Sequence, residues 1–122
     1  MLFRYVERDL LTNTTSFHVH EDYGIIEIPT PKNQGTSIES ARDEVWSITQ
    51  DDPLSSTGKA TFKVALQRHD EHNNLIHTTT VSDSEIRCTK DEWIWKAKLT
   101  AYQDKTLIFE KDFSKNIPRD FM

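Results

Sequence analysis

The sequence has 122 residues, of which 35% are hydrophobic and 29% charged, and its formal net charge is −5. A chain of this length fits a single domain, residues 1–122, and is long enough to bury a core without disulfides. Its basic residues are scattered singly among acids, which argues against a nucleic-acid binder because phosphate contacts need a concentrated positive patch.

The single cysteine, Cys88, cannot form an internal disulfide and suits a reducing compartment. Charged residues interrupt the apolar residues of the N-terminus every two or three positions, unlike a signal peptide. The chain also lacks an apolar run approaching about 18 residues. We therefore expect a soluble, cytoplasmic protein that does not interact with membranes.

Alternation with a period of two, which places one set of side chains on each face of a strand, recurs along most of the chain. It predicts a short strand over residues 2–6 and a first hairpin with strands at residues 17–20 and 25–28. The segment 22–24 is the predicted reversal of this hairpin, because Gly24 accepts the positive φ of a tight turn. The polar residues 12–15 are typical of a turn.

Two longer connections are expected in the middle of the chain. Residues 29–37 contain two prolines, which cannot donate to a ladder, and predict a loop. Residues 40–43 are ambiguous and could hold one helical turn, whereas residues 45–49 favour a strand. Residues 51–58 predict the second connection, with Pro53 holding Asp52 out of the helical region.

From residue 58 onward the strand pattern is strongest. Predicted turns at residues 70–74, 89–92 and 103–105 separate runs of alternating apolar and polar residues, and residues 82–84 are interpreted as a bulge or bend. Consecutive strands joined by short turns are typical of an antiparallel meander. The expected fold is all-β, a strongly curved sheet or an incomplete barrel with little or no helix.

Three tryptophans, Trp46, Trp93 and Trp95, add to an apolar face that must be covered. Filling a core is their ordinary role. They could instead line the cavity of a small barrel that binds an apolar ligand. If the sheet does not close, the same face becomes an exposed patch that points to a partner chain or a homodimer.

His18 and His20 are two apart on a predicted strand and therefore point the same way, as two ligands of one zinc or copper ion would. Glu21, Asp22, His69 and His72 are the candidate third ligands, and solvent exposure of both histidines is the simpler interpretation. Cys88 lies near Arg87 and Lys90, whose positive charge would make its thiol reactive, yet its alternation with Ile86 favours burial. We expect no metal and no cofactor.

Three segments resemble one protein family. They are Trp46-Ser47-Ile48-Thr49, Asp51-Asp52-Pro53-Leu54-Ser55 and Ile117-Pro118-Arg119-Asp120-Phe121. They are similar to the extreme C-terminal part of the cocaine esterase-like, X-Pro dipeptidyl-peptidase-like (CocE/NonD) hydrolases, as is the stretch from Leu99 to Lys111.

The resemblance implies serine hydrolysis by an α/β-hydrolase core with a Gly-x-Ser-x-Gly elbow. The three glycines of this chain, Gly24, Gly35 and Gly58, form no such motif, so no catalytic residue is carried over. The resemblance therefore implies a non-catalytic accessory β module that packs on a hydrolase catalytic domain or on another subunit. For the Pro53 segment we expect an ordered turn, and for Arg119 and Asp120 a tail anchored to the sheet.

Overall fold

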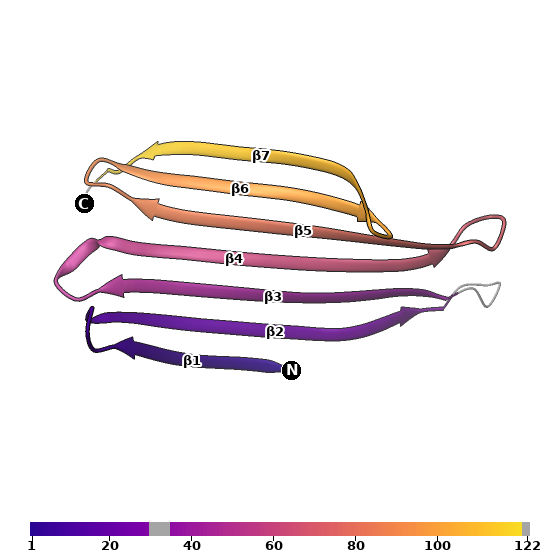
Figure 1. Cartoon of the computed structure of the whole chain (residues 1–122), viewed down its shortest axis with the longest axis horizontal. Coiled ribbons are helices and arrows are strands. Elements are labelled where there is room, and N and C mark those ends of the chain that lie inside the picture. The colour runs from indigo at the N-terminus through magenta and orange to yellow at the C-terminus, as the bar shows by residue number, and fades with distance from the viewer. Residues whose placement is uncertain (30–34, 121–122) are drawn as a thin grey trace.

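The computed structural model describes residues 1–29 and 35–120, which form one antiparallel sheet of seven strands with no helix. The strands are β1 (Leu2–Asp9), β2 (Thr14–Ile28), β3 (Thr36–Thr49), β4 (Asp52–His69), β5 (Leu75–Cys88), β6 (Glu92–Gln103) and β7 (Thr106–Pro118). They lie side by side in chain order, as Figure 1 shows, so every neighbour in the sheet is also a neighbour in the sequence. The expected all-β antiparallel meander is confirmed.

The sheet is open. β1 pairs only with β2, and β7 pairs only with β6, so both strands are edges. β4, with 18 residues, is much longer than the five or six residues typical of a strand. Within the described ranges no second layer lies on either face of this long sheet (Figure 1).

Two of the expected connections are wrong. The predicted first hairpin is instead the single strand β2, which carries a bulge between Asp22 and Ile25 opposite β3. Gly24 has φ of 72°, and its N–H donates to the Asp22 carboxylate at 2.8 Å, so the positive φ serves a bulge and not a reversal. The chain reverses earlier, at residues 10–13, where the Asp9 carboxylate accepts the N–H of Leu11.

The second wrong connection is residues 51–58, most of which belong to β4. The turn takes only two residues, with Asp51 at φ of 61°, and the extra residues enter an irregular register opposite β3. Residues 40–43 belong to β3 and form no helical turn. Of the predicted 29–37 loop, residues 30–34 lie outside the described part of the chain, and Ser37 is already in β3.

The predicted bulge at residues 82–84 is also absent, because β5 pairs without a register shift to both β4 and β6. The three late turns form as predicted. At the β4–β5 hairpin, the Asp70 carboxylate accepts the N–H groups of Asn74 and His72, each at 2.8 Å, and these bonds, that from Asn74 foremost, lower the pKa of Asp70.

Gly58 lies in β4 at a position where a neighbouring side chain leaves no room for a Cβ atom. It pairs with Trp46 across β3 and β4, and the six-membered ring of Trp46 covers it. A Cβ atom at residue 58 would overlap that ring. A glycine that weakens a strand is thus covered by an aromatic neighbour.

We predict that Gly58→Ala lowers the free energy of unfolding by about 1–3 kcal/mol, because the Trp46 ring must move off its place on the sheet. Urea unfolding followed by tryptophan fluorescence measures the loss. Gly35→Ala is the matched control, since a Cβ there meets nothing within 4 Å and should leave the midpoint unchanged. Equal midpoints for the two variants would contradict the prediction.

Candidate functional site

One face of the sheet is apolar, and its composition follows from the register. Paired residues of an antiparallel sheet point to the same side, so a row can be traced across all seven strands from Trp95. This row is Val6, Phe17, Trp46, Gly58, Ile86, Trp95 and Lys115. We call the side to which it points the apolar face. Other large apolar residues of this face are Val19, Phe62, Val64, Leu66, Leu99, Phe109 and Phe113.

The apolar face is largely uncovered. Among the described residues, the only buried hydrophobic ones are Val19 and Cys88, each 7% exposed. Trp46 is 47% exposed, Phe62 42% and Phe109 47%, values typical of surface residues. Soluble monomers rarely expose a contiguous apolar patch of more than a few hundred Å², and larger patches mark interaction sites. The apolar face is therefore the candidate functional site.

A small ionic cluster lies within this face on β2 and β3. Arg42 Nη2 is 2.9 Å from Glu21 Oε2, and Arg42 Nη1 is 3.7 Å from Glu44 Oε1. The Tyr23 hydroxyl donates to the same Glu21 oxygen at 3.1 Å. Arg42 Nε is buried and has no hydrogen-bond partner. The cluster holds one cation and two carboxylates, so it has an acidic excess of its own.

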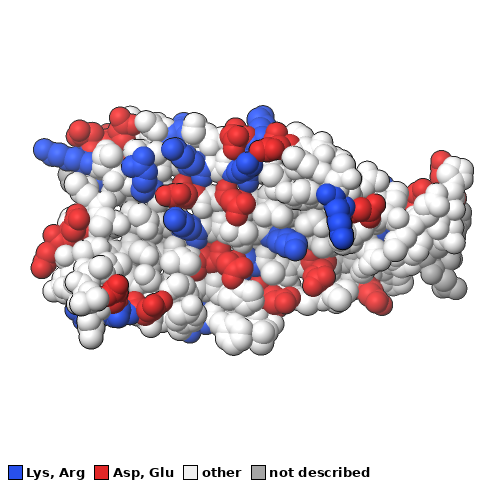
Figure 2. All heavy atoms as spheres, in the orientation of Figure 1, with Lys and Arg blue, Asp and Glu red and all other residues white. Residues whose placement is uncertain are grey.

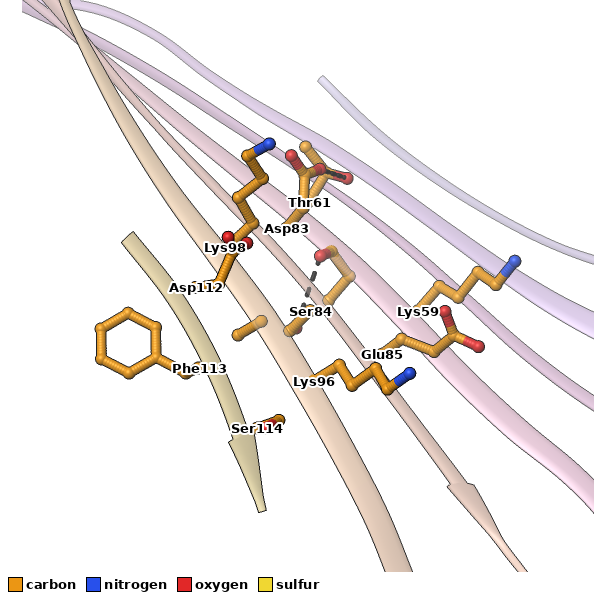
Figure 3. Close-up of a pocket in the computed structure, with 12 residues that line it drawn as sticks. Lys59, Thr61, Asp83, Ser84, Glu85, Lys96, Lys98, Asp112, Phe113 and Ser114 are labelled. Atoms are coloured by element: carbon orange, nitrogen blue, oxygen red, sulfur yellow. Dashed lines mark hydrogen bonds between the residues drawn. The ribbon is translucent and has the colours of Figure 1, made fainter. Parts of the chain in front are cut away.

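The opposite face is strongly charged, and Figure 2 shows its Lys and Arg side chains interleaved with Asp and Glu. A groove of about 500 Å³ crosses this charged face over β4–β7. It runs between two cross-strand rows, Lys59–Glu85–Lys96–Ser114 and Thr61–Asp83–Lys98–Asp112. In Figure 3, Lys59, Glu85 and Lys96 extend to one side of the groove and Phe113 to the other.

The groove shows no chemistry that would select a ligand. Its cations and anions alternate along both rows, so it presents no field of a single sign to a phosphate or a polycation. Thr61 donates to Asp83 at 2.8 Å, and Lys98 Nζ lies 2.6 Å from Glu110, whose carboxylate raises the pKa of Lys98. These contacts are those of a solvated, charged surface.

His18 and His20 point to this charged face, on the same side as predicted, and each is engaged by its neighbours. The His18 ring stacks on Tyr5 with centroids 4.4 Å apart, and its Nε2 is 3.3 Å from Glu7 Oε2. His20 Nδ1 is 2.5 Å from Asp43 Oδ1. His69 and His72 lie at the β4–β5 hairpin, two strands away.

Within residues 1–29 and 35–120, no group of three or more His, Cys, Asp or Glu residues could hold a metal ion. The sulfur of Cys88 is buried and lies 3.9 Å from the carbonyl oxygen of Leu54. Trp46, Trp93 and Trp95 share the apolar face of an open sheet, and none of them lines the groove of the charged face.

The segments around Pro53 and Pro118 are built into the sheet. Ser55 Oγ accepts the N–H of Thr49 at 2.7 Å and donates to the carbonyl of Asp52, fixing the Pro53 segment at the start of β4. Ser56 donates to the Pro53 carbonyl at 2.9 Å. The hydroxyl groups of Ser55 and Ser56 thus order this segment.

The C-terminal tail is anchored through Arg119. Its guanidinium lies 5.1 Å from the centroid of the Trp93 ring and donates to the Thr89 carbonyl at 2.6 Å. The backbone N–H of Arg119 donates to the Asp91 carbonyl. A cation–π interaction and hydrogen bonds to carbonyl oxygens thus anchor the tail to the sheet. Pro118 pairs with Glu92 as the last residue of β7, and Phe121 lies outside the described residues.

Comparisons with protein-family models, with curated proteins and with solved structures found no match to this chain. In the described ranges, the chain has no helix long and apolar enough to cross a membrane.

The environment of Tyr23 in the ionic cluster predicts how the stability of the protein depends on pH. Partial desolvation and the hydrogen bond to Glu21 raise the pKa of the Tyr23 phenol. Because the folded state favours the protonated phenol, this group adds stability below the unfolded pKa of about 10, and that stability is lost as pH rises toward the folded pKa. The difference in absorbance at 295 nm between wild type and Tyr23→Phe reports the ionisation of Tyr23, and we expect it to titrate above about pH 10. We also expect the free energy of unfolding to fall more steeply with pH in wild type than in Tyr23→Phe. A Tyr23 midpoint at or below about 10 would contradict this.

Proposed function

We propose that this chain is a non-catalytic β module that acts by association, and that its apolar face packs against a partner. The observation that carries the proposal is the sheet itself, which is one layer thick over the described residues and leaves Trp46 and Phe62 about half exposed. Protein domains are built from at least two packed layers because an apolar face must be buried against another element. A partner supplies the missing layer.

The surface area of the chain supports this proposal. A folded monomer of 14.2 kDa has an accessible surface of about 6,800 Å² by the usual scaling with mass, whereas this chain exposes 9145 Å². The excess is about 2,300 Å². Stable interfaces bury about 800 Å² on each partner, and obligate ones more, so the excess surface of the chain is in the range that a permanent complex buries.

The resemblance to a hydrolase family suggests which class of protein the partner belongs to. The segments around Pro53 and Pro118 are similar to the C-terminal part of CocE/NonD hydrolases, and both belong to the ordered sheet. We infer that the partner is the catalytic core of such a hydrolase and that the chain contributes packing to it and no reacting group. A cytoplasmic location is part of this proposal, since an unpaired cysteine suits a reducing compartment.

The test measures binding of this chain to a separately expressed CocE/NonD-type catalytic core that lacks its own C-terminal module. We expect a one-to-one complex by size-exclusion chromatography with light scattering. Phe62→Asp, in the middle of the apolar face, should weaken it about tenfold or more because the interface would bury an unpaired charge. Lys63→Asp, one position along β4 on the charged face, is the control and should bind like wild type. A wild-type chain that stays apart from the core, or a Phe62→Asp chain that binds as tightly, would refute the proposal.

A further inference from the structure

The charged residues of the apolar face indicate the chemistry of the surface that covers it. In the strands described, its basic residues are Arg4, Arg8, Arg42, Arg68, Lys111 and Lys115, and its acidic residues are Glu21 and Glu44. Both acidic residues belong to the cluster around Arg42. Outside that cluster, Lys111 and Lys115 have no acidic neighbour on this face, and Arg4 lies diagonally across from Glu21 without forming an ion pair with it.

The cations outside the cluster lie at the margins of the face. Arg4 is on the edge strand β1, Lys111 and Lys115 are on the edge strand β7, and Arg68 is at the end of β4. None of the four forms an ion pair with another described residue, although Arg68 interacts electrostatically with the Asp70 carboxylate and Lys111 Nζ lies 5.0 Å from the centroid of the Phe113 ring. We call them the cationic rim. Arg8 is left out because it donates to Asn13 and Gln50 in the neighbouring turn.

The cationic rim disfavours a second copy of the chain as the covering layer. In an aligned two-fold pair of sheets, β1 of one copy lies over β1 or β7 of the other. Either arrangement brings Arg4 near Arg4, Lys111 or Lys115 of the other copy, and like charges in a low-dielectric interface repel. Covering the face requires a surface whose apolar centre is bordered by acids.

We propose that the apolar face is covered by a different protein surface, one with an apolar centre and carboxylates along the margins that meet β1 and β7. The rim charges would select this partner and the apolar centre would hold it, in keeping with the general division between electrostatic specificity and hydrophobic affinity. This inference rests on the proposed role of the apolar face as an interface, and it names the chemistry of the partner independently of the hydrolase assignment.

The chain itself provides a probe of this chemistry. The variant Arg4→Glu, Lys111→Glu, Lys115→Glu carries the same apolar centre with acidic margins, and we call it the acid-rim variant. We expect wild type alone and the acid-rim variant alone to sediment as monomers at 50 mM salt. An equimolar mixture should form a heterodimer, at least about tenfold tighter than either self-association. This complex should weaken about fivefold or more at 500 mM salt, because screening removes the rim attraction.

Two controls keep the result interpretable. The variant Lys59→Glu, Lys63→Glu, Lys96→Glu makes the same charge change on the charged face and should form no complex with wild type. Circular dichroism checks that each variant keeps its sheet, and if the acid-rim variant is unfolded, the double variant Lys111→Glu, Lys115→Glu replaces it, since it changes only β7.

Three results would overturn the inference. A stable wild-type homodimer would make the second copy the occupant, and failure of the mixture to associate would show that the margins do not select the partner. Binding of wild type to phosphatidylglycerol vesicles, without association with the acid-rim variant, would assign the face to an anionic membrane surface. The hydrolase proposal is judged separately, because the core can fail to bind while the acid-rim variant binds, and the reverse.

Discussion

The structure depends on one constraint, which is that an apolar sheet face cannot stay in contact with water. Every strand from β1 to β7 contributes to the same face, because antiparallel pairing passes the orientation of one residue to its partner on the next strand. In the row from Val6 to Lys115, the paired residues keep the same orientation across all seven strands. Burial of the centre of that row, from Phe17 to Trp95, is the largest stabilisation still available to the chain, and it requires a surface from outside the described sheet.

The two faces of the sheet differ in composition and in their contact with solvent. The charged face is solvated by alternating cations and anions, some of them paired, such as Lys98 with Glu110. The apolar face contributes area, and its sparse charges restrict what can lie on it. A partly buried ionic cluster such as that of Arg42 contributes little net stability compared with apolar residues of the same volume, but mispairing it is costly. On the proposed role of the apolar face, cluster and rim bear on partner choice more than on the folding free energy.

Much of the fold was accessible from the sequence, because period-two alternation is a strong signal in one-sided strands. The runs around Phe62 and Trp95, and the turns at residues 70–74 and 103–105, were predicted on this basis. The errors arose where turn chemistry was read without its tertiary context. Asp22 and Gly24 are residue types typical of a chain reversal. The ladder to β3 nevertheless continues past them, so pairing with the neighbouring strand produces a bulge here and not a turn.

The candidate site was predictable in part. The concentration of Trp46, Trp93 and Trp95 on one side, and the need to cover that side, follow from spacing alone. The cationic rim does not, because Arg4 and Lys115 are more than a hundred positions apart and share a face only through six successive registers. One local signal was present: Lys111 and Lys115 are in phase with Phe109 and Phe113, which places them on the apolar side of β7.

The chain-order topology has a consequence for how the molecule forms. Each strand contacts only the strands before and after it, so the sheet behaves as a one-dimensional array in which hairpins can form early and add neighbours in sequence. Such a ladder needs no long-range loop closure, and it can grow outward from the β4–β5 hairpin before the last edge is in place. Assembly with the covering layer would then follow folding of the ladder as a separate, concentration-dependent step.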